Sequence, residues 1–226
     1  MPGVRRTEDA AVQRGRQCAA RWLSGHGFTL VELLVVMSII AVLVSIVFPV
    51  LARTKERAYL TQCTLNARQI GMAVKMYAQD YDDRFPYATT IDSGSKLGGV
   101  ATLPKVLAPY VANRDIWFCQ SWLAEHGDLL EGPKSMWRSY DATYGYNAFP
   151  DRPEETLLGR AVGDIKNSAT KPMVWCASGS AHSSIGADDW GAGAIGAVNV
   201  CFVDGHVKLI HCTLREFTNQ VFSVPK

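Results

Sequence analysis

The sequence predicts an α+β protein, in which a long N-terminal helix packs through its second half on a small antiparallel β-sheet. Residues 33–51 form a charge-free apolar run, and the following residues keep a helical spacing of apolar side chains to about residue 81. The C-terminal part instead contains short β-rich runs, two of which flank the dipeptide Asp204-Gly205. This dipeptide is typical of two-residue type I′ hairpin turns, which need a positive φ at both central residues.

The apolar run is long enough to span a membrane, and an acidic residue, Glu32, stands at its start. A carboxylate is costly in lipid and usually has a partner there. Hydrolysis of the peptide bond between Gly27 and Phe28 would create one, because the new amine is mostly cationic at neutral pH and lies four residues before Glu32, on one helix face. We therefore expect a helix over residues 28–51 that spans a membrane or forms a core with other copies of itself.

A secretory signal peptide is the main alternative for this segment, because Val50-Leu51-Ala52 has the small-residue character of a cleavage site. The apolar run is longer than the roughly 7–15 residues of such a peptide, and Glu32 does not suit its start. These features favour the membrane helix.

Residues 52–83 are predicted to extend the same helix in amphipathic form, with the globular domain at 84–226. Aspartates and Pro86 end the helix near Tyr81, and Pro49 is expected to kink it. A helix from Phe28 to Tyr81 would be about 81 Å long, so its first half needs lipid or other copies of itself. The apolar side chains of the second half recur at steps of three and four residues: Leu60, Cys63, Ala67, Ile70, Val74, Tyr77 and Tyr81.

The residues before the predicted cut form a basic leader, 1–27, which we expect to stay in the cytoplasm. It takes five of the 23 basic and two of the 21 acidic residues, which leaves 18 basic and 19 acidic residues in the mature chain. That balance argues against broad binding to nucleic acid, which needs a basic surface.

Beyond the helix, the pattern predicts short elements separated by loops. We expect loops at 84–104 and 178–197, a short helix or turn at 106–111, strands at 139–147 and 173–177, and the hairpin at 198–212. In the hairpin, pairing Val203 with His206 would place Phe202 opposite Val207. Val200 and Phe202 would then face the N-terminal helix.

The segment Gly27-Phe-Thr-Leu-Val-Glu32, followed by the apolar run, resembles the class III signal of type IV prepilins and type II secretion pseudopilins. The resemblance implies a type IV pilin-like fold. It also implies that prepilin peptidase cuts after Gly27 and N-methylates Phe28. Glu32 would register each subunit against the terminal amine of its neighbour in the filament, and a proline at the offset of Pro49 bends the helix in this family.

The hairpin carries a second resemblance, to prepilin-like proteins with a C-terminal "processing-associated" motif, His-x9-Asp-Gly. The matching residues are Asn199, Val200, Phe202, Asp204, Gly205, His206 and Val207. The motif's histidine position holds Ala194. This departure removes the basis for a metal or catalytic role of the His/Asp pair.

Five cysteines remain after removal of the leader, so at least one stays unpaired if disulfides form. Cys63–Cys119 is the first candidate disulfide and Cys176–Cys201 the second, with buried free thiols as the alternative. No two histidines show zinc-ligand spacing, so no metal site and no cofactor are predicted. Ca²⁺ in the C-terminal loop is an option through Asp188, Asp189 and Asp204, against the simpler interpretation of solvated carboxylates.

Taken together, these features predict a prepilin-like structural subunit of a type II secretion pseudopilus or a type IV pilus-like filament, and not an enzyme. Its expected partners are prepilin peptidase, other pilin or pseudopilin subunits, an inner-membrane assembly platform and lipid. Its C-terminal domain is expected on the periplasmic or extracellular side of the inner membrane. The alternative is a minor tip pilin, an adhesin or a module that binds substrate or DNA through residues 178–197. An anchored enzyme is disfavoured, because the sequence shows no convergent catalytic residues.

Overall fold

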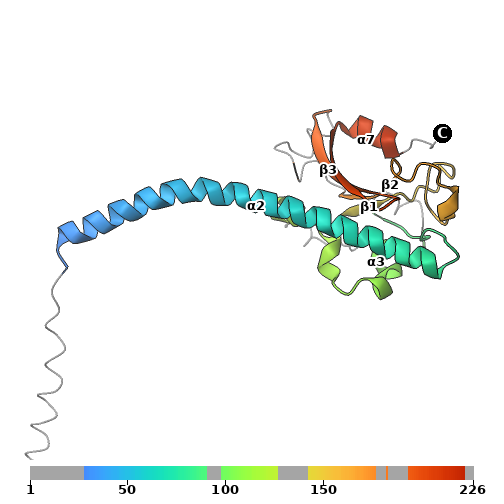
Figure 1. Cartoon of the computed structure of the whole chain (residues 1–226), viewed down its shortest axis with the longest axis horizontal. Helices are drawn as coiled ribbons and strands as arrows, with labels where there is room; N and C mark the ends of the chain where they lie inside the picture. The colour runs from blue at the N-terminus through green and yellow to red at the C-terminus, as the bar shows by residue number, and fades with distance from the viewer. Residues whose placement is uncertain (1–27, 91–97, 127–141, 177–181, 183–192, 222–226) are drawn as a thin grey trace, which may run out of the picture. The chain divides into compact units, whose positions relative to one another are not determined.

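The computed structural model describes residues 28–90, 98–126, 142–176, 182 and 193–221. The chain divides into two compact units, Met1–Leu51 and Ala52–Lys226. One long helix, α2 (Leu30–Asp80), begins in the first unit and ends in the second (Figure 1). The sequence placed this helix at Phe28–Tyr81, within two residues at its start and one at its end.

The described part of the first unit consists of the N-terminal residues of α2 and the two residues before it. All of its side chains are exposed, and its large apolar side chains reach an exposed fraction of 87% at Leu30. By length and composition, α2 is a candidate membrane span. Pro49 lies inside the helix, and the kink expected there stays a prediction.

The second unit contains a four-stranded antiparallel sheet with the strand order β1-β2-β3-β4. Its strands are β1 (Tyr144–Tyr146), β2 (Pro172–Cys176), β3 (Gly196–Phe202) and β4 (Val207–Cys212). The shorter helical elements are α3 (Leu103–Val106), η2 (Ala108–Tyr110), η3 (Arg114–Trp117), α4 (Gln120–His126), η5 (Val162–Asp164) and α7 (Leu214–Val221). The predicted α+β class is therefore confirmed: a long apolar N-terminal helix and a small antiparallel sheet.

One face of the sheet packs on the second half of α2. The predicted apolar stripe supplies the helix side of this core, with Cys63, Ala67, Ile70 and Val74 buried. The closest approach is at Gly71, where an added Cβ would lie 2.4 Å from Sγ of Cys201 on β3. Glycine suits this position because an added Cβ would collide with the Cys201 side chain unless that side chain moved.

The opposite face of the sheet is covered by α7, a helix that the sequence analysis did not predict (Figure 1). Its buried residues, Phe217 and Val221, belong to a second apolar cluster, and the Trp175 and Phe217 rings meet edge to face with centroids 5.5 Å apart. The sheet members of this cluster are Trp175, Val198, Val200, Phe202 and Cys212. Strands β1, β2 and β3 are therefore buried on both faces, whereas β4 is only partly buried.

The hairpin between β3 and β4 differs from the prediction in register. Cys201 pairs with Val207, so Phe202 does not lie opposite Val207, and four residues, 203–206, lie between the end of β3 and the start of β4. The loop is wider because its backbone has partners elsewhere: the Asp204 N–H donates to the carbonyl of Ser168, 3.1 Å away. Within the 203–206 loop only Gly205 has a positive φ, of 97°, whereas a type I′ turn needs two, so this loop contains no type I′ turn.

The face assignment of β3 was also wrong. Val200 and Phe202 lie in the cluster under α7, whereas Cys201 lies in the core against α2. An alternating pattern could not decide between the faces, because every residue of β3 is buried.

Candidate functional site

The N-terminal candidate site is a hydrogen-bonded cap at the start of α2. Oε2 of Glu32 accepts hydrogen bonds from the Thr29 backbone N–H at 2.8 Å and from the Thr29 hydroxyl at 2.7 Å. In return, Oγ1 of Thr29 accepts from the Glu32 backbone N–H at 3.2 Å. This reciprocal pattern is a capping box, which satisfies two backbone donors that the first turn of a helix leaves without partners.

The cap changes the predicted relation of Phe28 to Glu32. Because Thr29 occupies the cap position, helix α2 begins at Leu30 and Phe28 precedes it, with an exposed fraction of 79%. In the uncut chain Phe28 therefore lies outside the helix that contains Glu32, and the expectation that the two residues share one helix face after cleavage stays a prediction. Gly27 lies outside the described residues, so its geometry at the predicted cut stays open.

Beyond Glu32, the first unit presents an apolar surface without charge up to Arg53. Its large apolar side chains, from Leu33 to Leu51, are at least 46% exposed. Such a surface is stable in lipid or against other apolar helices but not in water.

Comparison with known proteins bears on this segment. A family model, the prokaryotic N-terminal methylation motif, matches residues 24–48. The chain carries a prepilin-type N-terminal segment. The matched range contains Gly27, Phe28 and Glu32, the three residues on which the first resemblance rests. No curated protein and no solved structure matches the chain significantly.

The prepilin motif implies processing by prepilin peptidase and assembly with other pilin subunits, and it points to a structural subunit. Together with the apolar helix, it suits anchoring in a membrane. The match ends at residue 48, so the second resemblance, at the C-terminal hairpin, stays a prediction.

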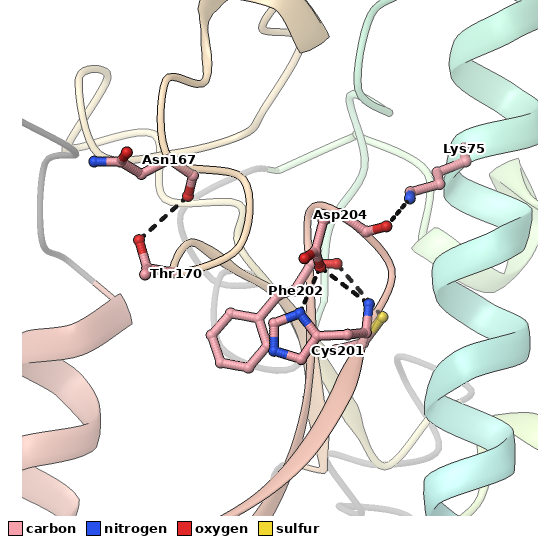
Figure 2. Close-up of polar contacts among 7 residues, drawn as sticks. Lys75, Asn167, Thr170, Cys201, Phe202 and Asp204 are labelled. Atoms are coloured by element: carbon pink, nitrogen blue, oxygen red, sulfur yellow. Dashed lines mark hydrogen bonds and ion pairs between the residues drawn. The ribbon is translucent and has the colours of Figure 1, made fainter.

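The hairpin residues of the second resemblance form contacts within the 203–206 loop and with α2 (Figure 2). Oδ1 of Asp204 accepts from the His206 backbone N–H at 3.0 Å and lies 2.6 Å from its Nδ1. Although partial burial raises the pKa of Asp204, the hydrogen bonds and charge of His206, with the nearby Lys75, hold that pKa below its usual range. The Lys75 ammonium donates to the Asp204 carbonyl.

Two further motif residues have structural contacts. The His206 ring stacks on Phe202 with centroids 4.4 Å apart. Asn199 is fully buried, and its Oδ1 accepts from the Thr64 hydroxyl of α2 at 3.3 Å. These contacts anchor the hairpin to the helix. The calcium option cannot be followed, because Asp188 and Asp189 lie outside the described residues, as does most of the 178–197 loop.

A third candidate site is a cluster of thiols and one imidazole in the core of the second unit. Cys63 on α2, Cys119 directly before α4, Cys176 at the end of β2 and His182 place one ligand atom each within 4.8 Å of one another. The three cysteines are buried and His182 is half-buried. All five cysteines of the described residues are free thiols, and the predicted Cys63–Cys119 disulfide stays a prediction.

The thiols of this cluster have strongly perturbed pKa values. Hydrogen bonds from the thiols of Cys119 and then Cys176 lower the pKa of Cys63 well below its usual range, against the opposing effect of burial. A hydrogen bond from Cys176 lowers the pKa of Cys119, but the bond to Cys63 and burial outweigh it and raise that pKa to about 12. The same contacts raise the pKa of Cys176. Cys63 is therefore the thiol of the cluster that loses its proton most readily.

Two other groups contact the cluster from outside. The Tyr144 hydroxyl lies 3.3 Å from Sγ of Cys63, and the Trp122 backbone N–H donates to Cys119. The sequence analysis missed this site because its ligands come from separate parts of the chain. The shortest spacing, from Cys176 to His182, is not a recognised zinc motif.

Proposed function

We propose that this chain is a structural filament subunit that is cut between Gly27 and Phe28, N-methylated at Phe28 and assembled through its N-terminal helix. The filament would be a type II secretion pseudopilus or a type IV pilus-like fibre. The observation that carries the proposal is the methylation-motif match over 24–48, directly on a helix whose apolar side chains are exposed. An exported domain, residues 52–226, would follow on the other side of the membrane.

The exposed helix needs an apolar environment both before and after assembly. Burial of apolar surface contributes about 25 cal/mol per Å², so the whole first half of α2 strongly disfavours water. Lipid can cover this surface in the stored precursor, and the same helices of other subunits can cover it in a filament. The apolar run is therefore compatible with both the membrane-embedded precursor and the assembled filament.

Glu32 supplies what an apolar helix lacks, which is a fixed position relative to its neighbour. Both side-chain hydrogen bonds to Thr29 use one oxygen, Oε2. The carboxylate thus has a second oxygen with which to face the amine of Phe28 in an adjacent subunit. Capping within one subunit and ion pairing between subunits are compatible in this arrangement.

The experiment separates these two roles of Glu32. Glu32→Gln keeps an acceptor for the capping box but removes the charge, whereas Thr29→Ala weakens the cap and keeps the charge. We expect Glu32→Gln to insert into the membrane and to be processed, with filament yield reduced at least tenfold. Thr29→Ala should assemble at close to the wild-type level.

The measurement is the ratio of sheared filament to membrane-bound subunit, in cells that contain the complete assembly system. Normal filament yield from Glu32→Gln would contradict the charge-based assembly. A loss from Thr29→Ala together with normal yield from Glu32→Gln would show that the cap, and not the ion pair, is what assembly needs.

A further inference from the structure

The cysteine and histidine cluster in the exported domain has the donor set and spacing of a metal site. In tetrahedral zinc sites the Zn–S distance is about 2.3 Å and the Zn–N distance about 2.0–2.1 Å, which separates sulfur and nitrogen ligands by about 3.5 Å. Sγ of Cys119 and Nε2 of His182 are 3.5 Å apart, and all four ligand atoms lie within 4.8 Å of one another. One ion would contact all four with small shifts.

We propose that Cys63, Cys119, Cys176 and His182 together bind one zinc ion as a structural site. Three thiolates and one imidazole form a Cys₃His set, which is typical of closed tetrahedral zinc sites. Sulfur donors select zinc over calcium and magnesium, which take oxygen ligands. With four protein ligands there is no open position for water, so the ion stabilises the domain and performs no hydrolytic chemistry.

The negative charge that three thiolates would carry favours the binding of a cation. Three thiolates in a buried space repel one another, which limits how many of them the cluster can hold without a cation. A divalent ion removes this limit, because a coordinating thiol is deprotonated outright. The Tyr144 hydroxyl near Cys63 and the Trp122 N–H at Cys119 would then donate to metal-bound sulfur, as outer-sphere partners do in known sites.

A disulfide explains the clustering of these four side chains less completely than a zinc ion does. Any single disulfide in the cluster uses two sulfurs and leaves the third thiol and the imidazole without a role. The zinc ion instead joins α2, the segment before α4, and β2 at one point. Because these segments are distant in sequence, metal binding would couple strongly to folding of the domain.

The test uses the full-length chain, purified in detergent without chelators. Elemental analysis should find about one zinc per chain. Cys63→Ser and Cys176→Ser should lose the metal, and His182→Ala should weaken binding at least tenfold. Cys201→Ala is the matched control, because it removes a buried cysteine outside the cluster, and it should retain the metal. Replacement of zinc by Co²⁺ should give the absorption bands of tetrahedral cobalt–thiolate.

A second measurement uses only the wild-type chain, so it remains informative if the variants fail to fold. The wild-type chain, stripped of metal under reducing conditions, should regain thermal stability on addition of one equivalent of Zn²⁺. A stripped chain that takes up neither Zn²⁺ nor Co²⁺, or whose melting temperature is unchanged by zinc, would overturn the proposal. So would a native disulfide between any two of the three cysteines, detected by mass spectrometry. This inference does not rest on filament assembly and stands or falls separately.

Discussion

Gly71 is the position where the packing of helix α2 on the sheet can be tested most sharply. Gly71→Ala places a methyl group 2.4 Å from Sγ of Cys201 and 3.2 Å from Cε of Met173. Normal contact between such atoms begins near 3.5 Å, so the sulfur has to move by about 1 Å in a buried position. Overpacking of this kind costs about 1–3 kcal/mol.

The helix itself favours the substitution, since alanine is better than glycine inside a helix by up to about 1 kcal/mol. We therefore expect Gly71→Ala to lower the free energy of unfolding by about 1–2 kcal/mol. In the Cys201→Ala background the sulfur is gone, and the same substitution should be neutral or stabilising by up to about 1 kcal/mol. The coupling between the two sites would then be about 1–3 kcal/mol.

The assay is a double-mutant cycle by chemical denaturation, followed by tryptophan fluorescence of the full chain in detergent. Thermal melts give a second reading, at about 2–4 °C per kcal/mol for a domain of this size. A Gly71→Ala penalty that persists in full when Cys201 is alanine would refute the close approach of helix and strand.

Two further predictions concern the helix that closes the sheet. Lys171 is buried, its ammonium donates to the carbonyl of Val221 at 2.9 Å, and burial lowers its pKa to about 8. Because the unfolded chain then binds more protons between about pH 8 and 10.5, this residue should make stability rise with pH there, by up to about 3 kcal/mol. Denaturation over that range should show the contribution lost in Lys171→Met and kept in the exposed control Lys166→Met. Thr213→Ala should cost about 1 kcal/mol by removing the capping box of α7, whereas Thr218→Ala in the same helix should cost little.

The long helix was predictable because two local signals agree on it. Apolar side chains from Cys63 to Val74 recur at helical spacing, and Pro86 with the preceding aspartates marks the end. The sheet was predictable as a set of β-rich runs. The register of the hairpin was not predictable. The backbone of the 203–206 loop is hydrogen-bonded to the Ser168–Lys171 segment, which is far from the turn in sequence and leaves no mark on the local pattern.

The thiol cluster and α7 show a different limit. Cys63, Cys119 and Cys176 are each ordinary buried cysteines in their own segment, and only the packing of α2 on the sheet brings them together. Helix α7 has eight residues, too few for a convincing period. Its start is marked by Thr213 and Glu216, whose three-residue spacing is the sequence signal of a capping box.

The central claim, that this chain is a processed prepilin-like subunit, is tested most directly at its N-terminus. The measurement is mass spectrometry of the N-terminal peptide of the mature protein from cells that contain prepilin peptidase. The account predicts a chain that begins at Phe28 with one added methyl group, and none of this product from Gly27→Val. A mature chain that begins after Ala52, or one that keeps the leader uncut beside an active peptidase, would contradict it.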